Sequence, residues 1–571
     1  MKKTDFTKSW RFGRTGEELV PVSVPHDAML SEERKAENPS GSGAAYFAGG
    51  CYEYEKVFTL PECSSAVLLF EGIYPTGEIF LDGQKAAFAN YGYGDCFVDC
   101  SHLADGKPHT VHVTADNTAT PNSRWYSGAG IYRPVWLYTG DEVHILPEGI
   151  RVTTLSYDPA VIRVQTAHTG GNIHISILDG EHIVAAADGD DVTVEIPDAK
   201  LWDDEHPNLY TCRASLESDS AEVRFGIRTL KWNVDGFFVN GKPVKFRGGC
   251  IHHDNGILGA RSYYASEYRR MAKLKSLGFN AVRSAHHPMC RSLLDACDAL
   301  GLYVMDETWD MWYSFKTEHD YSARFEENWE RDVEAVVSKD YNHPCVVMYS
   351  IGNEVTEPVE EKGVELAHTL VQKFHALDGT RPTTAGINPA LIMMRKMQKR
   401  MDGQVQPEKE EKEVNVTSTE FNKMVSEMGK RMTEGASRPE VDEVSSPCLN
   451  ALDIAGYNYA TSCYEVDAVR HPSRLMVGSE TFPQDLPTNW ALVEKLPYLY
   501  GDFMWTAWDY LGEAGIGAWI YGENCPDFGK PYPWLLADTG AVDILGNETA
   551  EAGQASVVWG ARKRPTSVPA L

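Results

Sequence analysis

Eight short apolar runs recur between residues 244 and 505, and this repeat restricts the fold of the chain more than any other feature. Helical patterns separate most of the runs, for example at Ala265–Leu277, Ser292–Leu300, Ala323–Asp340, Lys362–Leu377 and Thr488–Tyr500. The predicted strands are Val244–Arg247, Ala281–Ser284, Tyr303–Asp306, Val346–Ser350, Thr383–Ile387, Ile454–Tyr457, Leu475–Gly478 and Phe503–Trp505. Strands that alternate with helices pair in parallel, because each helix crosses back over the sheet. Eight such units predict a (β/α)8 TIM barrel, and a doubly wound sheet is the alternative.

The chain before residue 229 is rich in predicted strands. Residues 1–140 hold alternating runs such as Cys51–Leu60, Ser65–Phe70, Glu78–Leu81 and His109–Ala115, which predict an N-terminal β-sandwich of the jelly-roll type. Residues 141–228 predict an immunoglobulin-like β-sandwich, because about seven strands in fewer than 90 residues is typical of that fold. Its runs are Ile150–Thr154, Val161–Thr166, Ile173–Leu178, Val192–Ile196, Tyr210–Leu216 and Ala221–Ile227. The predicted domains are therefore 1–140, 141–228 and a barrel at 229–571.

A charged stretch at about 393–446 interrupts the barrel pattern between the fifth and sixth predicted strands. Its centre is Glu408-Lys409-Glu410-Glu411-Lys412-Glu413. Such a run is typical of a solvated, partly helical insertion. The alternative is a lid or a partner-binding arm, since loops that follow barrel strands surround the mouth of the barrel.

The formal charge of the chain is −29 at pH 7. A chain this acidic is repelled by phosphate backbones and anionic lipid, which argues against binding to nucleic acid or to a membrane surface. No run of about 18 apolar residues occurs, and no apolar stretch follows the basic N-terminal residues. The twelve cysteines contain no C-x-x-C pair. We therefore expect a soluble cytoplasmic protein with reduced cysteines rather than a disulfide framework.

Two carboxylates follow apolar runs at the ends of predicted barrel strands. Glu354 comes after the fourth strand and Glu480 after the seventh. A carboxylate that emerges from an apolar run is poorly solvated, so it needs partners or a proton. Glycosidic bond cleavage uses two such groups, one to protonate the leaving oxygen and one to attack the anomeric carbon or activate water. The alternative is that each Glu is a structural acid paired with Lys or Arg.

The other strand ends carry side chains that suit a sugar ligand. These residues are His252, His253, Asp254, Arg283, His286, His287, Trp309, Asn458, Tyr459 and Trp505. Sugar hydroxyls need donors and acceptors of this kind, and the C–H faces of sugars pack on Trp. The four histidines are also candidate metal ligands, but nothing in their spacing fixes a ligand set. Together the strand ends favour a carbohydrate site at the mouth of the barrel.

Three segments of the sequence resemble the motifs of one known family. Gly352-Asn353-Glu354 matches an acid/base motif, Gly478-Ser479-Glu480 matches a nucleophile position, and residues 123–133, which end in Gly-Ile-Tyr-Arg, match a signature of an N-terminal domain. With these motifs in this order, the sequence resembles the β-galactosidase/β-glucuronidase group of retaining glycoside hydrolases, family 2, over nearly its whole length. The resemblance implies a sandwich, an immunoglobulin-like domain and a catalytic barrel.

The resemblance also implies roles for residues at the reaction centre. Glu354 corresponds to the general acid/base and Glu480 to the nucleophile of a double displacement. Asn353 corresponds to the residue that binds the sugar 2-hydroxyl, and Tyr459 to a catalytic tyrosine beside the nucleophile. Arg283 is expected to orient the nucleophile carboxylate.

Further residues are implied as substrate-binding groups. His252 and His286 correspond to two pocket histidines that contact the sugar. Trp505 corresponds to a tryptophan that forms the floor under the sugar. Asp254 and Trp309 are expected at the rim of the pocket. The resemblance implies a carbohydrate substrate and a homo-oligomer. Some members of the family have a magnesium site, but we expect no required cofactor or metal in this chain.

The identity of the sugar depends on charged residues. Glucuronidases of the family carry an Asn-x-Lys pair near the barrel end, but the only lysines after Trp505 are Lys530 and Lys563, outside such a pattern. This absence favours galactose over glucuronic acid, since an anionic sugar needs a positioned cation. However, Arg124 stands where large galactosidases of the family place an Asp, and it could bind a substrate carboxylate. A β-glucuronidase or a β-mannosidase therefore stays an alternative.

Two further classes compete with the glycosidase. A carbohydrate-binding protein on a degenerate glycosidase scaffold predicts a lost carboxylate, and both carboxylates are present. A metal-dependent hydrolase that uses the histidines predicts activity that a chelator removes. The sequence favours a retaining exo-β-glycosidase, with a β-galactosidase as the leading assignment.

Overall fold

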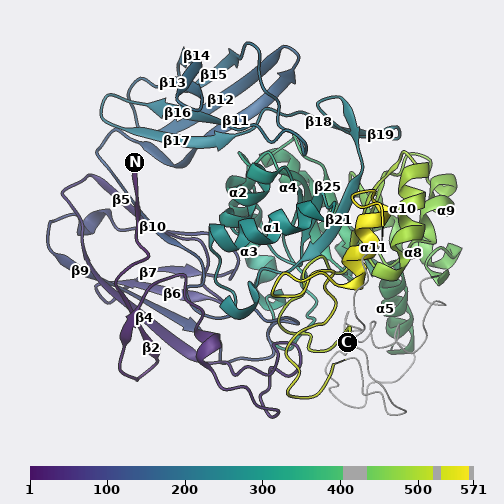
Figure 1. Ribbon diagram of the computed structural model, residues 1–571. Coiled ribbons are helices and arrows are strands. Elements are labelled where there is room, and N and C mark those ends of the chain that lie inside the picture. Colours follow the sequence, from purple (N-terminus) through teal and green to yellow (C-terminus); the bar gives the residue numbers. More distant parts are fainter. Residues whose placement is uncertain (403–433, 519–528, 565–571) are drawn as a thin grey trace.

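The computed structural model describes residues 1–402, 434–518 and 529–564 (Figure 1). Two β-sandwiches flank a central barrel, one in purple at the N-terminus and one in blue above the barrel. In these described ranges, no helix has the length and apolar character needed to cross a membrane. The predicted multidomain fold class is confirmed, while the exact domain boundaries stay predictions.

The first sandwich is built from two antiparallel sheets. The six-stranded sheet has the order β3 (Val20–Val22), β2 (Trp10–Arg14), β4 (Cys51–Thr59), β9 (Pro108–Asp116), β6 (Gly77–Leu81) and β7 (Gln84–Ala89). The four-stranded sheet has the order β1 (Lys2–Asp5), β10 (Val135–Gly140), β5 (Ser65–Phe70) and β8 (Cys96–Asp99). Val111, Val113 and Ala115 alternate with partly exposed neighbours along β9, as expected for a strand with one buried face. The two sheets meet where Trp10 contacts Phe70, with ring centroids 6.3 Å apart.

The second sandwich has its own hydrophobic core. Its three-stranded sheet has the order β11 (Ile145–Tyr157), β12 (Ala160–His168) and β15 (Asp191–Glu195). Its four-stranded sheet has the order β14 (His182–Asp188), β13 (His174–Asp179), β16 (Tyr210–Ser215) and β17 (Ser220–Phe225). A small sheet of β18 (Leu230–Asn233), β19 (Gly236–Val239) and β20 (Lys242–Val244) connects this sandwich to the barrel. Strand β14 has no counterpart among the predicted strands, because its residues are mostly exposed and give no apolar run.

Eight parallel strands close into the barrel, each paired with the next and the last with the first. They are β21 (Phe246–Ile251), β22 (Ala281–Ser284), β23 (Tyr303–Glu307), β24 (Val346–Asn353), β25 (Thr383–Ile387), β26 (Ala455–Asn458), β27 (Met476–Thr481) and β28 (Leu499–Met504). Every residue of β24 is buried, which is typical of parallel strands covered on both faces. All eight predicted strands are present.

Helices surround the barrel strands (Figure 1). They are α1 (Tyr264–Ser276), α2 (Arg291–Leu300), α3 (Ser322–Asp340), α4 (Glu361–Leu377), α5 (Pro389–Asp402), α8 (Pro439–Leu449), α9 (Cys463–Arg470), α10 (Leu486–Lys495) and α11 (Ala550–Val558). The prediction of one helix from Thr488 to Tyr500 is wrong at its end, because α10 stops at Lys495 and β28 begins at Leu499. The apolar residues of β28 fit either period, so the sequence does not separate the two elements.

The charged insertion lies only partly in the described chain. Helix α5 at its start and α8 at its end pack against each other beside the barrel. The central Glu408–Glu413 run lies outside the described residues. Its interpretation as a solvated insertion or a lid stays a prediction.

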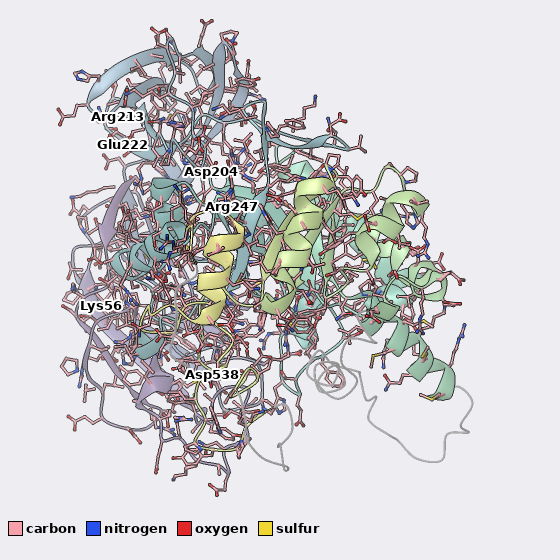
Figure 2. All side chains as sticks on the ribbon, turned by 45° about the vertical axis from the view of Figure 1, so that its right-hand side comes forward. Lys56, Asp204, Arg213, Glu222, Arg247 and Asp538 are labelled. Carbon is pink, nitrogen blue, oxygen red and sulfur yellow. The ribbon has the colours of Figure 1, made fainter. Side chains whose placement is uncertain are left out.

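The two sandwiches contact opposite ends of the barrel. From the first sandwich, the Tyr91 hydroxyl donates to the Thr308 carbonyl, which follows β23. From the second, Asp204 accepts a hydrogen bond from Tyr303 at the start of β23. Asp204 and Arg247, which Figure 2 labels, are each hydrogen-bonded to Asn280. Because catalytic groups of such barrels lie at the carboxyl ends of the strands, the first sandwich is the one placed beside the mouth.

Candidate active site

Glu480 lies near the end of β27, where three side chains hold its carboxylate. The Tyr459 hydroxyl donates to Oε1 over 2.6 Å. Arg283 Nη1 and Asn458 Nδ2 donate to Oε2 over 2.8 and 3.1 Å. These bonds come from strands β22, β26 and β27, so the closed barrel brings together residues nearly 200 positions apart. The orientation of the carboxylate is fixed before any ligand binds.

Glu354 follows the last residue of β24 and is also buried. Asn388, which follows β25, donates from Nδ2 to its Oε1 atom over 2.9 Å. Glu354 has a φ of +44° and Tyr459 a φ of +53°, both in the left-handed region that side chains with a Cβ rarely adopt. Such strained positions cluster at functional sites.

The electrostatic environment of Glu480 combines opposing effects. Burial raises the pKa of Glu480 to about 7, with Arg283 lowering it and the nearby Glu354 raising it. The group is 5% exposed, so little solvent screens the interaction with Glu354. Two carboxylates that interact in a buried site favour a state in which one carries a proton.

A buried network around Arg283 connects the candidate nucleophile to Asn353. Arg283 is fully buried and donates to both oxygens of Glu307 over 2.7–3.2 Å and to Asn353 Oδ1 over 2.9 Å. Asn353 in turn donates from Nδ2 to Asp310 over 2.9 Å. One cation therefore sets the positions of Glu480, Glu307 and Asn353 together.

The two predicted pocket histidines lie among aromatic rings. His286 stacks on Trp505 with centroids 5.2 Å apart and an interplanar angle of 2°. Burial lowers the pKa of His286 well below its usual value, so its ring is neutral. Its Nδ1 lies 2.8 Å from Glu307 Oε1 and carries the proton, which leaves the Nε2 lone pair to accept a hydrogen bond.

His252 is the clearest group in the site that awaits a partner. Its ring packs between Trp505, 5.5 Å away, and Tyr510, 4.1 Å away by centroids. Neither ring nitrogen has a hydrogen-bond partner in the part of the chain that the structure describes. An unsatisfied buried nitrogen costs roughly 1–3 kcal/mol, which a ligand hydroxyl would offset.

Arg124 reaches the site from the first sandwich. Its guanidinium donates to both oxygens of Asp310 over 2.7 and 2.9 Å and to Glu513 over 3.1 Å. Lys316 adds a second cation, 2.8 Å from Asp310. Burial raises the pKa of Asp310, but Arg124 and Lys316 outweigh it and hold that pKa well below the usual range. The charge of Arg124 is therefore already compensated.

The structure contradicts the expected position of Trp309. Its indole N–H donates to Asp332 in α3 over 3.1 Å, and its ring packs on Phe325 of the same helix. The side chain therefore points outward from the end of β23 and not to the rim. Successive side chains of a strand point to opposite faces, and the sequence did not reveal which face Trp309 takes.

Asp254 is also buried. Its Oδ1 accepts the Gly256 N–H over 3.0 Å, and burial raises the pKa of its carboxyl to about 7. Contact between Asp254 and a substrate stays a prediction.

Four polar residues at strand ends complete the site, and only Asn458 among them was named with the strand-end side chains, without a role. They are Glu307, Asp310, Asn388 and Asn458. The signal that could have found Asn388 is its place directly after the buried strand β25. Glu307 ends β23 and Asp310 follows it, but Trp309 was the residue predicted from this segment.

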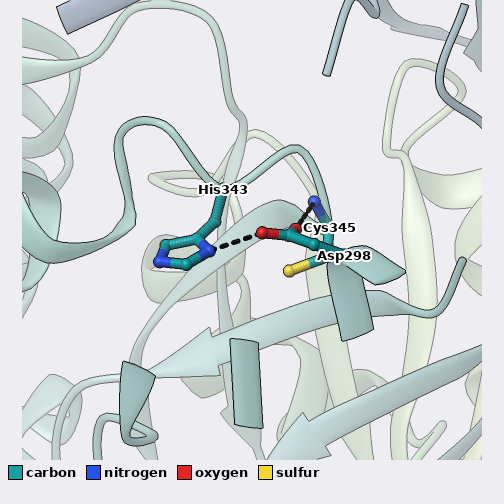
Figure 3. Close-up of side chains that lie close together, drawn as sticks. All are labelled: Asp298, His343 and Cys345. Carbon is teal, nitrogen blue, oxygen red and sulfur yellow. Dashed lines mark hydrogen bonds and ion pairs between the residues drawn. The ribbon is translucent and has the colours of Figure 1, made fainter. Parts of the chain in front are cut away.

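A group of candidate metal ligands lies away from these carboxylates (Figure 3). Asp298 of α2 lies close to His343 and Cys345, which precede β24 at the amino end of the barrel. Asp298 accepts hydrogen bonds from His343 Nδ1 over 2.6 Å and from the Cys345 N–H over 3.0 Å. Burial lowers the pKa of His343, but Asp298 outweighs this effect and raises it. The geometry is that of an ion pair that fixes α2 to β24.

Comparison with known proteins relates the chain to one family. Residues 231–443 match the model "Glycosyl hydrolases family 2, TIM barrel domain", and residues 150–228 match "Glycosyl hydrolases family 2". Beta-galactosidase BoGH2A of Bacteroides ovatus is 30% identical, over 95% of this chain and 70% of that protein. A putative beta-glucuronidase of Formosa agariphila is 27% identical over 92% of this chain, which spans 51% of its length.

A solved structure of a glycosyl hydrolase family 2 member from Bacteroides cellulosilyticus has the same architecture. Its TM-score is 0.83 at 28% identity, and the match covers 98% of this chain and 71% of that one. The predicted family and the predicted class of enzyme, an O-glycosyl hydrolase, are thereby confirmed. The chain belongs to glycosyl hydrolase family 2.

Proposed function

We propose that the protein is a retaining exo-β-glycosidase in which Glu480 is the nucleophile and Glu354 the general acid/base. The unequal hydrogen bonding of the two carboxylates carries this assignment. Three donors, including the cation of Arg283, fix and stabilise ionised Glu480. Glu354 accepts one side-chain hydrogen bond among the described residues, from Asn388. A nucleophile needs fixed orientation, while an acid/base must exchange its proton with the leaving oxygen and then with water.

The reaction proceeds as a double displacement. Glu480 attacks the anomeric carbon, and the glycosidic C–O bond breaks as Glu354 gives its proton to the leaving oxygen. The ester that forms on Glu480 is neutral, so Glu354 no longer faces the negative charge of the nucleophile. Glu354 then takes a proton from water, which attacks the anomeric carbon and restores Glu480. Neutral His252 and His286 supply acceptors for sugar hydroxyls, and Trp505 offers an apolar face.

Charge balance supports a neutral sugar, with β-galactosides as the leading substrates. Each of the three cations around the described site is already paired: Arg283 with Glu307 and Glu480, Arg124 with Asp310 and Glu513, and Lys316 with Asp310. A uronate carboxylate would therefore enter a site with an excess of carboxylates. The similarity to a named β-galactosidase points the same way.

A β-glucuronidase is the second candidate. Relatives with that name support it, and Arg124 is the cation that would bind the substrate carboxylate. Binding would require Arg124 to exchange Asp310 or Glu513 for the substrate.

The test is release of 4-nitrophenol from the β-galactoside, the β-glucuronide and the β-mannoside by the wild-type protein and by Glu480→Gln. We expect turnover of the galactoside that the substitution abolishes. Turnover of the glucuronide alone would overturn the charge argument and assign its carboxylate to Arg124, which Arg124→Gln would then check. Failure with all three sugars would overturn the proposed function as stated.

A further inference from the structure

A cleft opens between the first sandwich and the barrel, at the side of the site where Arg124 lies. Its free space of about 520 Å³ includes open solvent at its mouth. Loops of the first sandwich supply one wall with Tyr74, Tyr91 and Tyr93, and the segment after β23 supplies the other with Lys316, Tyr321 and Arg324. The cleft also borders His286 and Asp310, and Asp310 is hydrogen-bonded to Asn353, the residue before Glu354.

Aromatic rings that pack on one another line this cleft. The rings of Tyr91 and Tyr321 lie 4.5 Å apart by centroids across the boundary between sandwich and barrel. Tyr93 lies 5.5 Å from Tyr91 and 5.4 Å from Tyr74. A continuous group of rings at the mouth of a carbohydrate site suits a sugar ring or an aryl group.

Arg324 lines the cleft outside the group of cations described above, and it differs from them because the described residues give it no anionic partner. In the described chain, no carboxylate lies within ion-pair distance of its guanidinium, and its buried Nε has no hydrogen-bond partner. The hydroxyl of Thr317, which also lines the cleft, is likewise without a partner there. Arg124 and Lys316, by contrast, both contact Asp310.

The acidic groups near Arg324 are already engaged. Both oxygens of Asp320 accept hydrogen bonds, one from Ser322 and the other from the backbone N–H groups of Lys316 and Thr317. Asp332 accepts hydrogen bonds from Tyr321 and Trp309. A guanidinium left with open donors beside an aromatic wall is suited to bind a carboxylate or a sulfate on a ring.

We propose that this cleft receives the leaving group of the glycoside and that Arg324 selects leaving groups that carry a negative charge. This inference rests on the proposed glycosidase function and adds a substrate class to it: a neutral sugar joined to an anionic ring. The charge comes either from a carboxylate, as in a uronate, or from a sulfate ester. Arg324 is thus a specificity-determining residue and takes no part in bond cleavage.

The test compares three phenyl β-galactosides whose ring carries a carboxylate, a sulfate ester or a neutral carboxamide at the same position. Released galactose gives kcat and KM for the wild-type protein, Arg324→Gln and Arg324→Lys. Arg331→Gln is the matched control, since Arg331 lies on the same helix, is exposed and does not line the cleft.

We expect the wild-type protein to prefer the anionic substrates through a lower KM. Arg324→Gln should lower kcat/KM for them by about tenfold, as loss of one charge-assisted hydrogen bond implies, and should leave the carboxamide within about twofold. Arg324→Lys should keep part of the preference for the anionic substrates. Arg331→Gln should keep the whole of that preference. The better of the two anionic substrates identifies the source of the charge.

Two results would overturn this inference and leave the proposed glycosidase function intact. One is hydrolysis of all three galactosides without a preference for charge, and the other is an equal loss on all three in Arg324→Gln. If none of the galactosides, including the 4-nitrophenyl compound, were hydrolysed, the proposed galactosidase function would fail first, and the leaving-group assignment with it.

Discussion

The Nη1 atom of Arg283 lies 2.8 Å from Oε2 of Glu480, and the same guanidinium holds Glu307 and Asn353. Arg283 and Glu307 are fully buried. A single cation therefore pairs with two buried carboxylates and fixes the amide next to Glu354. This arrangement makes orientation of the nucleophile and stability of the barrel mouth depend on one residue.

Replacement of Arg283 should therefore affect both folding and activity. Arg283→Met leaves Glu307 and Glu480 without a cation, which should lower the free energy of unfolding by about 3–5 kcal/mol. Arg283→Lys keeps a charge without the planar fork, so it should lose less stability yet still lose most of kcat. Urea unfolding and 4-nitrophenyl galactoside kinetics measure the two effects. An Arg283→Met protein within 1 kcal/mol of wild type would contradict this role.

The pH dependence of kcat/KM should report the ionisation of Glu480. Burial raises its pKa to about 7, so the active ionised form is lost as the pH falls through about 7. Tyr459→Phe removes a donor that favours the carboxylate, which should shift this acidic limb to higher pH. Rate profiles with a highly activated aryl galactoside isolate the nucleophilic step. A limb that stays in place or moves to lower pH in Tyr459→Phe would count against the assignment.

Glu480 should also make stability depend on pH. Its folded pKa of about 7 lies above the unfolded value of about 4.5, so the folded state binds the proton more tightly. The stability gained in this way is fully present below pH 4.5 and is lost as the pH rises through 7, by up to about 3 kcal/mol.

Glu480→Gln has no such proton, so its stability lacks this dependence on pH. Between pH 5 and 8, the unfolding free energy of the wild type should therefore fall relative to that of the variant. Urea titrations at both values measure it, and other buried acids such as Asp502 and Asp509 cancel in the difference. A difference that does not change with pH would show that the pKa of Glu480 is not raised.

Loss of Glu354 should depend on the leaving group. Without its proton, Glu354→Gln should lower kcat/KM for phenyl β-galactoside by about 10²–10⁴-fold. A dinitrophenyl galactoside needs little protonation, so the loss of its kcat/KM should be far smaller. Asn388→Ala serves as a comparison, because it removes the hydrogen bond to Glu354 and keeps the acid. Equal losses on both substrates would contradict acid catalysis by Glu354.

The barrel was accessible from the sequence because its strands are buried on both faces and give apolar runs. Ala281–Ser284 and Thr383–Ile387 match the observed strands to the residue. The first strand begins two residues later than predicted and extends to Ile251, since Val244 belongs to the hairpin of β19 and β20. Both candidate catalytic carboxylates lie where the strand-end rule places them.

Other parts of the site depend on contacts that no local pattern encodes. Arg124 has two partners, Asp310 and Glu513. They come from two barrel loops almost 190 and 390 positions away in the sequence. The direction of Trp309 is decided by packing on α3 rather than by its place after β23. The sequence identified the strand ends, while the docking of the first sandwich decides which side chains share the mouth.

The most direct test of the central claim is to identify the residue that becomes covalently attached to the sugar. A preparation that hydrolyses the β-galactoside would be incubated with a 2-deoxy-2-fluoro-β-galactoside that has a good leaving group, since the fluorine slows hydrolysis of the glycosyl-enzyme. Peptide mass spectrometry then locates the label. The account predicts a single fluorogalactosyl ester on Glu480, absent in Glu480→Gln. A label on Glu354 or elsewhere, or unlabelled protein that still hydrolyses the galactoside, would contradict it.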